Sequence, residues 1–237
     1  METMLAARLY GKNDLRVEKV PVPEIGPGEI LLRVKAAAVC GTDLRMLQNG
    51  AAGVDESHPL TLAHEFSGVV ERVGAGPVRF RAGQRVCVAP NIGCGVCDRC
   101  VAGMSHHCAE LRALGVHMDG GFAEFVRIPA DAVRLGNVVA LDGAPDDTPG
   151  SALDGASVDT RGGAPRVSFE AAAANEAFSC VYNAFLRYRV HPGETVVIIG
   201  AGAIGLMHAK LAKMAGAAKI ILNDLSADRL RECAAIE

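Results

Sequence analysis

The chain has 237 residues, of which 50% are hydrophobic and 22% are charged, as is typical of a globular protein with one large domain or two ordinary ones. Its formal net charge is −3, and its 24 Lys and Arg residues are scattered along the sequence. Because nucleic-acid binding requires a basic patch that releases counterions, this distribution argues against a nucleic-acid partner.

The sequence also predicts the compartment. Residues 1–10 lack the basic region and apolar core of a signal peptide, and no apolar run approaches the roughly 20 residues that span a bilayer. We therefore expect a cytoplasmic protein without a membrane partner. Because the cytoplasm is reducing, the eight cysteines are expected to be metal ligands or free thiols rather than disulfides.

The first 140 residues predict a β-rich domain with a barrel-like or sandwich architecture. Apolar or alternating runs separated by Gly and Pro predict strands at residues 29–39, 66–73, 84–88 and 123–128. The only helix expected in this part is a short one at residues 42–47.

Residues 141–166 have a different composition. They are rich in Asp, Gly, Ala and Pro and have no apolar periodicity, so we expect an exposed loop or a disordered insertion. Their aspartates lack the spacing of an EF-hand, which favours a solvated loop over a calcium site.

After this segment, helices and strands are expected to alternate. Ser226 is expected to cap the last helix, and two short apolar runs predict parallel strands buried on both faces. Together these patterns predict the fold class α/β plus β, with a β-rich domain at residues 1–168 and a partial parallel βαβ domain at residues 169–237. The expected helices lie at residues 169–174, 176–188 and 203–215, and the expected strands at 195–199 and 219–222.

A glycine-rich lobe carries four cysteines with the spacing Cys-x2-Cys-x2-Cys-x7-Cys. Four thiolates fill the tetrahedral coordination shell of zinc and leave no position for water or substrate, so the spacing predicts a structural zinc site. An iron–sulfur cluster is the chemical alternative. The four predicted ligands are Cys94, Cys97, Cys100 and Cys108.

A second metal site is suggested by three residues that lie far apart in the sequence. Cys40, His64 and Glu176 offer one thiolate, one imidazole and one carboxylate. Three protein ligands leave a fourth position open, as catalytic zinc requires. Spacing alone leaves the ordinary alternative open, in which Cys40 is a core thiol and His64 a hydrogen-bonded structural imidazole.

The motif GxGxxG follows a predicted strand and opens a predicted helix. Gly200 permits a tight turn, Gly202 lets the backbone approach a pyrophosphate, and Gly205 lets the helix pack on the strand. Ile204 lies at the same helix N-terminus, whose N–H groups favour phosphate. Asp224 ends the next predicted strand, where it would bind the adenosine ribose and repel a 2′-phosphate. NAD is therefore expected in preference to NADP, and a phosphate-free turn is the alternative.

These motifs, in this order, resemble the zinc-dependent medium-chain alcohol and polyol dehydrogenases, in particular the branch of sorbitol (iditol) and threonine dehydrogenases. The resemblance covers almost the whole chain apart from residues 141–166. It implies a GroES-like catalytic domain followed by a Rossmann domain, with catalytic zinc in the cleft between them. The matching segments are Cys40-Gly-Thr-Asp, Ala63-His-Glu-Phe-Ser-Gly, the four-cysteine lobe, Gly120-Gly-Phe-Ala-Glu-Phe, Asn175-Glu-Ala-Phe-Ser-Cys and Val197-Ile-Ile-Gly-Ala-Gly-Ala-Ile-Gly.

The resemblance also assigns roles to single residues. It implies that Cys40, His64 and Glu176 bind the catalytic zinc, with Cys180 as a rival of Glu176, and that Glu65 sits beside the metal. A further hydroxyl, that of Thr42, is implied to pass the proton of the alcohol outward while hydride moves to the nicotinamide. The expected cofactors are thus one catalytic zinc, one structural zinc and NAD, and the expected substrate is a small-molecule alcohol or polyol.

The sequence departs from the family pattern in several places. Ala63 replaces the usual glycine before the His-Glu pair, Arg45 replaces a frequent relay histidine, and Ala177 replaces a proline. The nucleotide domain of the family also continues for several more strands. We therefore expect a C-terminally truncated piece of a homo-oligomeric enzyme or, as the alternative, a catalytically impaired zinc-binding fragment of one.

Overall fold

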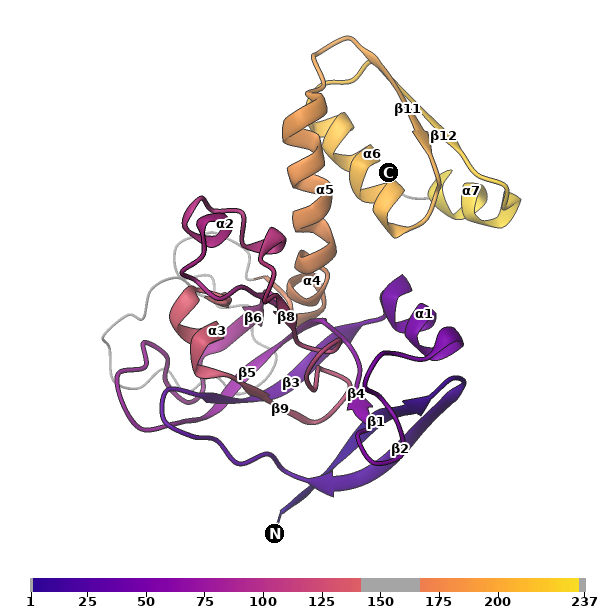
Figure 1. Ribbon diagram of the computed structural model, residues 1–237. Helices are drawn as coiled ribbons and strands as arrows, with labels where there is room; N and C mark the ends of the chain where they lie inside the picture. The colour runs from indigo at the N-terminus through magenta and orange to yellow at the C-terminus, as the bar shows by residue number, and fades with distance from the viewer. Residues whose placement is uncertain (1, 142–166, 235–237) are drawn as a thin grey trace. The chain divides into compact units, whose positions relative to one another are not determined.

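The structure is a computed structural model that describes residues 2–141 and 167–234 (Figure 1). The predicted insertion at residues 141–166 therefore lies, except for Leu141, outside the described residues. The chain divides into two compact units, Met1–Glu176 and Ala177–Glu237. The order of the elements confirms the predicted fold class, in which a β-rich part is followed by an α/β part.

The first unit is built on antiparallel strands in three sheets. One sheet has the strand order β2-β1-β4, the second has the order β10-β6-β5-β3-β9, and a small third sheet pairs β7 with β8. Each run predicted as a strand in this part of the chain overlaps one of these strands. The strands are β1 (Thr3–Gly11), β2 (Asp14–Pro21), β3 (Ile30–Ala38), β4 (Leu60–Thr61), β5 (Glu65–Val73), β6 (Arg85–Val88), β7 (Asn91–Ile92), β8 (Arg112–Ala113), β9 (Phe125–Ile128) and β10 (Val138–Ala140).

Strand β3 lies between two parts of the core. Ile30 and Leu32 point to the main core cluster, whereas Leu31 points to the opposite face and contacts a second cluster with Met4 and Phe125. Successive side chains of a strand point to opposite faces, so a strand with three consecutive buried residues must be covered on both sides. This burial fixes the register of β3 and therefore the position of the residues that follow it.

The helices of the first unit are short. The predicted helix at residues 42–47 is present as α1 (Gly41–Asn49), but the expectation that no other helix precedes residue 140 is wrong. Helix α3 begins after Pro129, buries Ala132 and Val133, and ends at Gly136 in a left-handed conformation. Six residues are too few for helical periodicity to show in the sequence. The remaining helices are α2 (Asp98–Val101), η1 (Ser105–His107), α3 (Ala130–Leu135) and α4 (Phe169–Ala173).

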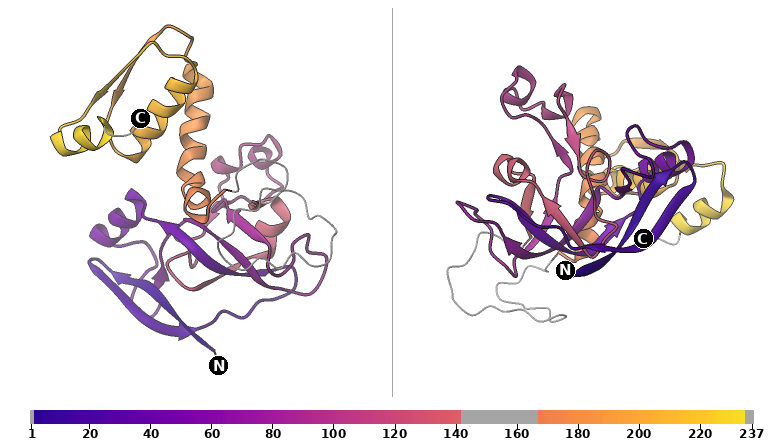
Figure 2. Two further views of the ribbon diagram at one scale, coloured as in Figure 1. Left: turned by 180° about the vertical axis from the view of Figure 1, so that it is seen from behind. Right: turned by 60° about the horizontal axis from the view of Figure 1, so that its bottom comes forward.

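Helix α5 (Asn175–Tyr188) begins at the end of the first unit and continues into the second. The second unit then contains β11 (Thr195–Ile199), α6 (Ala203–Met214), β12 (Lys219–Asn223) and α7 (Ala227–Ala234). The two strands are parallel, as predicted; they pair from Thr195 with Lys219 to Ile199 with Asn223, and α6 lies alongside them (Figure 2). The Oγ atom of Ser226 accepts the N–H of Arg229 at 3.3 Å, which confirms the predicted cap.

The expectation that both strands of the second unit are buried on both faces is wrong. Ile198 is 9% exposed, whereas Val197 and Ile199 on the opposite face of β11 are 60% and 87% exposed. The reason is that α6 covers one face of the sheet, and no described element of the unit covers the other. None of the described helices is long and apolar enough to cross a membrane.

Candidate metal centres and dinucleotide loop

The candidate catalytic metal site forms where β3 and β5 lie side by side. These strands pair antiparallel, and Ala38 lies opposite Glu65 at the end of their ladder. The chain that leaves β3 therefore meets the chain that enters β5. This register brings together Cys40, His64 and Glu65, whose sulfur, nitrogen and oxygen ligand atoms all lie within 4.8 Å of one another.

Asp43 is a residue of this site that the sequence analysis missed. Its carboxylate is 4% exposed, and its Oδ2 accepts the N–H of Cys40 at 2.8 Å while its Oδ1 accepts the N–H of Ala63 at 3.2 Å. It thus ties the start of α1 to the residue before His64. The signal was present in the sequence, because a carboxylate three residues after Cys40 is the second half of a helix capping box.

The imidazole of His64 is buried, and its Nδ1 has no hydrogen-bond partner among the residues that the structure describes. A buried polar atom without a partner is unfavourable. The same atom lies 4.0 Å from Oδ1 of Asp43, so a small rotation would let a neutral ring donate its Nδ1–H to that carboxylate. In that tautomer the lone pair of Nε2 is free to bind a metal.

The thiol of Cys40 responds to several neighbours. Burial raises its pKa, the N–H and hydroxyl groups of Thr42 lower it, and the carboxylate of Glu65 raises it. The net shift is upward, so this thiol keeps its proton in the absence of a cation. The hydroxyl of Thr42 also accepts a hydrogen bond from Nη2 of Arg45 at 3.2 Å.

Glu176 lies near the three residues that converge, but its carboxylate is not among the ligand atoms that lie within 4.8 Å of one another. Burial raises its pKa, the imidazole of His64 lowers it, and the carboxylate of Glu65 raises it. The two electrostatic effects place Glu176 within interaction range of His64 and Glu65. The rival residue Cys180 is exposed and belongs to the second unit.

The four cysteines of the lobe converge as a second group. Their sulfur atoms all lie within 4.8 Å of one another, and two pairs, Cys94 with Cys100 and Cys97 with Cys108, are each 3.9 Å apart. Four sulfurs around one zinc at about 2.3 Å are separated by about 3.8 Å. Disulfide bonding requires about 2.05 Å, and all eight cysteines are free, as predicted.

The lobe is also arranged electrostatically for a cation. The N–H groups of Val96 and then Cys97 lower the pKa of Cys94 to about 7. For Cys100, the N–H of Gly95 lowers the pKa, but burial and the neighbouring sulfurs outweigh it and raise the pKa to about 11. Four thiols at this spacing therefore cannot all ionise unless a positive charge lies among them.

A close approach in the lobe explains one of its glycines. A Cβ atom on Gly93 would lie 2.7 Å from Sγ of Cys100 and 3.1 Å from Cβ of Ser105. Any other residue would push one sulfur out of the group.

The dinucleotide motif forms the turn between β11 and α6 in the second unit. Gly200 has a φ of 105°, which favours glycine, and a Cβ atom on Gly205 would lie 1.9 Å from the carbonyl oxygen of Gly200. Gly202 is the N-cap of α6 and has no atom within 4 Å of the position of a Cβ atom. Ile204 lies in the first turn of α6 and is 48% exposed.

Asp224 follows β12 and holds the same turn. Its Oδ2 accepts the N–H of Ala201 and its Oδ1 accepts the N–H of Ser226, both at 2.8 Å. These two N–H groups, in that order, and then the nearby guanidinium of Arg229 lower the pKa of Asp224. The carboxylate is thus ionised and fixed beside the glycine-rich turn, with lone pairs to spare for a further donor.

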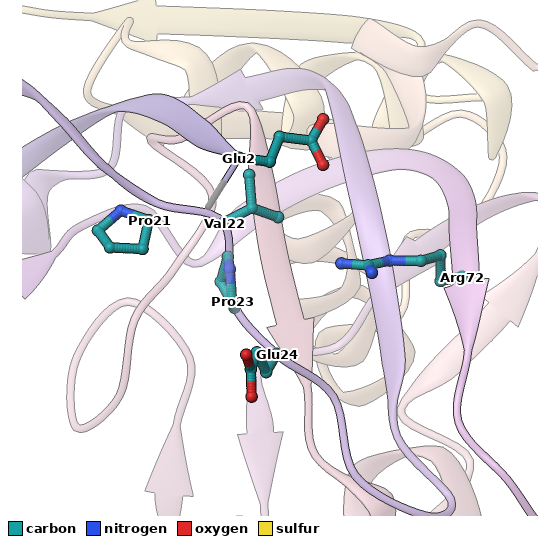
Figure 3. A pocket seen from close by; sticks show the side chains of 6 residues that line it. All are labelled: Glu2, Pro21, Val22, Pro23, Glu24 and Arg72. Atoms are coloured by element: carbon teal, nitrogen blue, oxygen red, sulfur yellow. The ribbon is translucent and has the colours of Figure 1, made fainter.

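A hollow elsewhere on the first unit contains none of the predicted site residues (Figure 3). Figure 3 shows the side chain of Arg72 extending toward Val22 and Glu2. The hollow is lined by Glu2, Pro21, Val22, Pro23, Glu24 and Arg72.

Comparisons with known proteins agree with this geometry. Residues 26–137 match the family described as the alcohol dehydrogenase GroES-like domain. The chain is 35% identical to L-threonine 3-dehydrogenase of Rhizobium johnstonii over 97% of its own length, and 33% identical to sorbitol dehydrogenase of Bacillus subtilis over 97%. Among solved structures, a provisionally assigned zinc-binding dehydrogenase from Sinorhizobium meliloti with bound NADP superimposes with a TM-score of 0.79 at 31% identity, over 99% of this chain.

The matches cover nearly all of this chain but only part of each relative. The chain covers 59% of the threonine dehydrogenase, 58% of the sorbitol dehydrogenase and 60% of the solved structure. The chain thus spans about three fifths of the length of the relatives that it matches.

Proposed function

We propose that this chain belongs to the zinc-dependent medium-chain alcohol and polyol dehydrogenase family and carries the zinc sites and the NAD-binding turn of an oxidoreductase. The reaction is the transfer of a hydride between an alcohol or polyol and NAD. The observation that carries this proposal is the convergence of Cys40, His64 and Glu65, whose ligand atoms lie within 4.8 Å of one another.

The donor set fits a catalytic zinc. Cys40 and His64 supply a thiolate and an imidazole, and Glu176 supplies the third ligand, while Glu65 lies beside the metal. The buried Nδ1 of His64 gains a partner in Asp43 once the ring orients toward the metal. When bound here, zinc would supply Lewis acidity toward the alcohol oxygen, and NAD would accept the hydride.

Other residues of the chain are proposed to transfer the proton, to position His64 and to bind the dinucleotide. The hydroxyl of Thr42, which is hydrogen-bonded to the thiol of Cys40, receives the proton of the alcohol at Oγ1 and releases its own proton to solvent water. The fixed carboxylate of Asp43 holds His64 and the start of α1 in place. In the second unit, the N-terminus of α6 at Gly202 binds the pyrophosphate, and Asp224 binds the ribose and disfavours NADP.

The four-cysteine lobe is proposed to hold a structural zinc, because its four sulfurs occupy all the positions of a tetrahedral ion. Thiolates of this kind persist in a reducing compartment, so we assign the protein to the cytoplasm. The whole protein is proposed to be a homo-oligomer that acts on small-molecule alcohols or polyols, without nucleic-acid or membrane partners.

The test is NADH formation, followed by absorbance at about 340 nm, with polyols and secondary alcohols as substrates. The zinc-loaded protein is expected to form NADH, and Cys40→Ser is expected to abolish the activity while the lobe keeps its zinc. Activity that survives in Cys40→Ser would contradict the proposal. Zinc binding without turnover on any alcohol would favour the alternative, a catalytically impaired zinc-binding fragment.

A further inference from the structure

Arg45 lies next to the proposed substrate site and has no role in the chemistry described above. Helical spacing places it one turn after Thr42 on the same face of α1. Its Nη2 donates to Oγ1 of Thr42 at 3.2 Å, and the hydroxyl of Thr42 interacts in turn with the thiol of Cys40. One hydroxyl group therefore separates this guanidinium from a proposed zinc ligand.

None of the carboxylates that the structure describes forms an ion pair with Arg45. Within residues 2–141 and 167–234, Thr42 is the only hydrogen-bond partner of its side chain. Some arginines of the first unit are paired with carboxylates, as Arg33 is with Glu71 and Arg112 with Asp131, so the position of Arg45 beside Thr42 rather than its lack of an ion pair sets it apart. Arg45 is also exposed, so most of its N–H donors face solvent beside the site.

A guanidinium in this position can recognise an anion but cannot relay a proton. It remains protonated throughout the range of pH in which proteins fold, and it has donors and no acceptor. Its planar fork of N–H groups matches the two oxygens of a carboxylate or the oxygens of a phosphate. A neutral polyol would leave the positive charge without a counterpart.

We propose that Arg45 is a specificity-determining residue that selects alcohols carrying an anionic substituent, a carboxylate or a phosphate, over neutral polyols. The inference rests on the proposed function, because it assumes that the alcohol binds beside Cys40 and His64. It adds the substrate class, which the metal ligands and the dinucleotide turn do not determine.

The test compares ligands with the same six-carbon skeleton. Dissociation constants of D-sorbitol, D-gluconate and D-sorbitol 6-phosphate for the zinc-loaded protein are measured by titration calorimetry. The protein is expected to bind at least one anionic ligand about tenfold or more tightly than sorbitol, as a charge-assisted bidentate contact allows. Gluconate and the phosphate ester distinguish a carboxylate from a phosphate as the group recognised.

Three variants make the result specific to Arg45. In Arg45→Gln the preference is expected to fall to within about twofold of unity, and Arg45→Lys is expected to keep part of it because charge remains while the fork is lost. Arg81→Gln, which removes another exposed arginine that contacts neither Thr42 nor a proposed metal ligand in any described hydrogen bond or ion pair, is expected to keep the full preference.

The experiment distinguishes a failure of the role proposed for Arg45 from a failure of the proposed function. An unchanged preference in Arg45→Gln, or sorbitol bound as tightly as both anions by the unmodified protein, would overturn the role of Arg45 and leave the proposed function standing. A protein that binds none of the three ligands would overturn both.

Discussion

Ala63 has a φ of 74°, a left-handed backbone conformation that residues other than glycine rarely adopt. It precedes His64, is fully buried, and packs so closely that a Cβ atom on Gly120 would lie 2.0 Å from its carbonyl oxygen. This backbone conformation orients His64 and is strained at Ala63. Glycine, which is usual at this position in the family that the sequence resembles, would adopt it without strain.

This conformation predicts that two substitutions of Ala63 differ in their effect on the free energy of unfolding. Ala63→Gly relieves strain but loses a buried methyl group, so its free energy of unfolding should stay within about 1 kcal/mol of the unmodified protein. Ala63→Val adds a β-branched side chain in a left-handed conformation without space, and should lose more than about 2 kcal/mol. Denaturant unfolding measures both, and equal stabilities would show that residue 63 is not strained.

Glu176 and Cys180 are competing candidates for the third zinc ligand. Of these two, Glu176 belongs to the first unit, and the pKa of its carboxyl group responds to His64 and Glu65. We therefore expect Glu176→Gln to weaken zinc binding at the catalytic site by about tenfold or more, measured by competition with a chelator, and Cys180→Ser to change it by less than about twofold. The reverse pattern would assign the ligand to Cys180.

The ionisation of Asp224 predicts a dependence of stability on pH. Its pKa in the folded protein lies below the ordinary value of 3.8, first because of the N–H of Ala201 and then that of Ser226. A carboxylate with a depressed pKa stabilises the fold above its unfolded pKa, and this stabilisation is lost as the pH falls through the folded pKa, that is, below 3.8.

Asp224→Asn should therefore melt at a lower temperature than the unmodified protein at neutral pH, because an amide nitrogen cannot accept one of the two N–H groups. The difference between the two melting temperatures should shrink as the pH falls below 3.8. Thermal melts from neutral to acidic pH measure this, and a difference that does not change with pH would mean that the charge is unimportant.

At the residue scale, the sequence predicted which residues belong to the candidate sites better than it predicted which of them lie close together. The spacing of the lobe cysteines is short enough to predict one metal group from the sequence alone. Cys40 and His64 are joined only by the register of β3 and β5, which depends on how the buried residues of β3 pack. The contacts of Asp43 and Arg45 depend in the same way on the position of α1.

At the scale of elements, the turn between β11 and α6 contains glycines that are needed for two different reasons, tight packing and ligand binding. Gly205 is needed for folding, because a Cβ atom would lie 1.9 Å from the carbonyl oxygen of Gly200. Gly202 has free space around it at the N-terminus of α6, so the described fold does not require glycine there, whereas the proposed approach of a pyrophosphate does.

The two glycines form a matched pair of variants. Gly205→Ala should destabilise the fold by about 1–3 kcal/mol through overpacking. Gly202→Ala should change stability by less than about 1 kcal/mol but weaken NAD binding on the order of tenfold, because the methyl group occupies the approach of the phosphates. Thermal melts and calorimetric titration with NAD separate the effects; a Gly202→Ala protein that binds NAD normally would contradict the proposed site.

The boundaries of elements were predictable where a local pattern sets them. Strand β11 is as long as its apolar β-branched run, and Ser226 caps α7 through its own side chain. Burial was not predictable in the same way, since an apolar strand such as β11 indicates two covered faces although α6 covers only one. Helix α3 was missed because its caps, Pro129 and Gly136, enclose only six residues.

At the scale of the whole molecule, the two units carry different parts of the proposed chemistry. The first contains both metal groups, and the second contains the dinucleotide turn. The order of the motifs, more than any one of them, carries the resemblance to the proposed family, because a zinc lobe or a GxGxxG turn alone occurs in many proteins.

The central claim is that the chain has a catalytic zinc site distinct from the structural one, and the number of zinc ions per chain tests it most directly. Elemental analysis of the purified protein should give about two zinc ions per chain, falling to about one in Cys40→Ser. A matched lobe variant, Cys94→Ser, should also retain about one if the lobe and the catalytic site bind independently. A single zinc ion in the unmodified protein, or two in Cys40→Ser, would contradict the account.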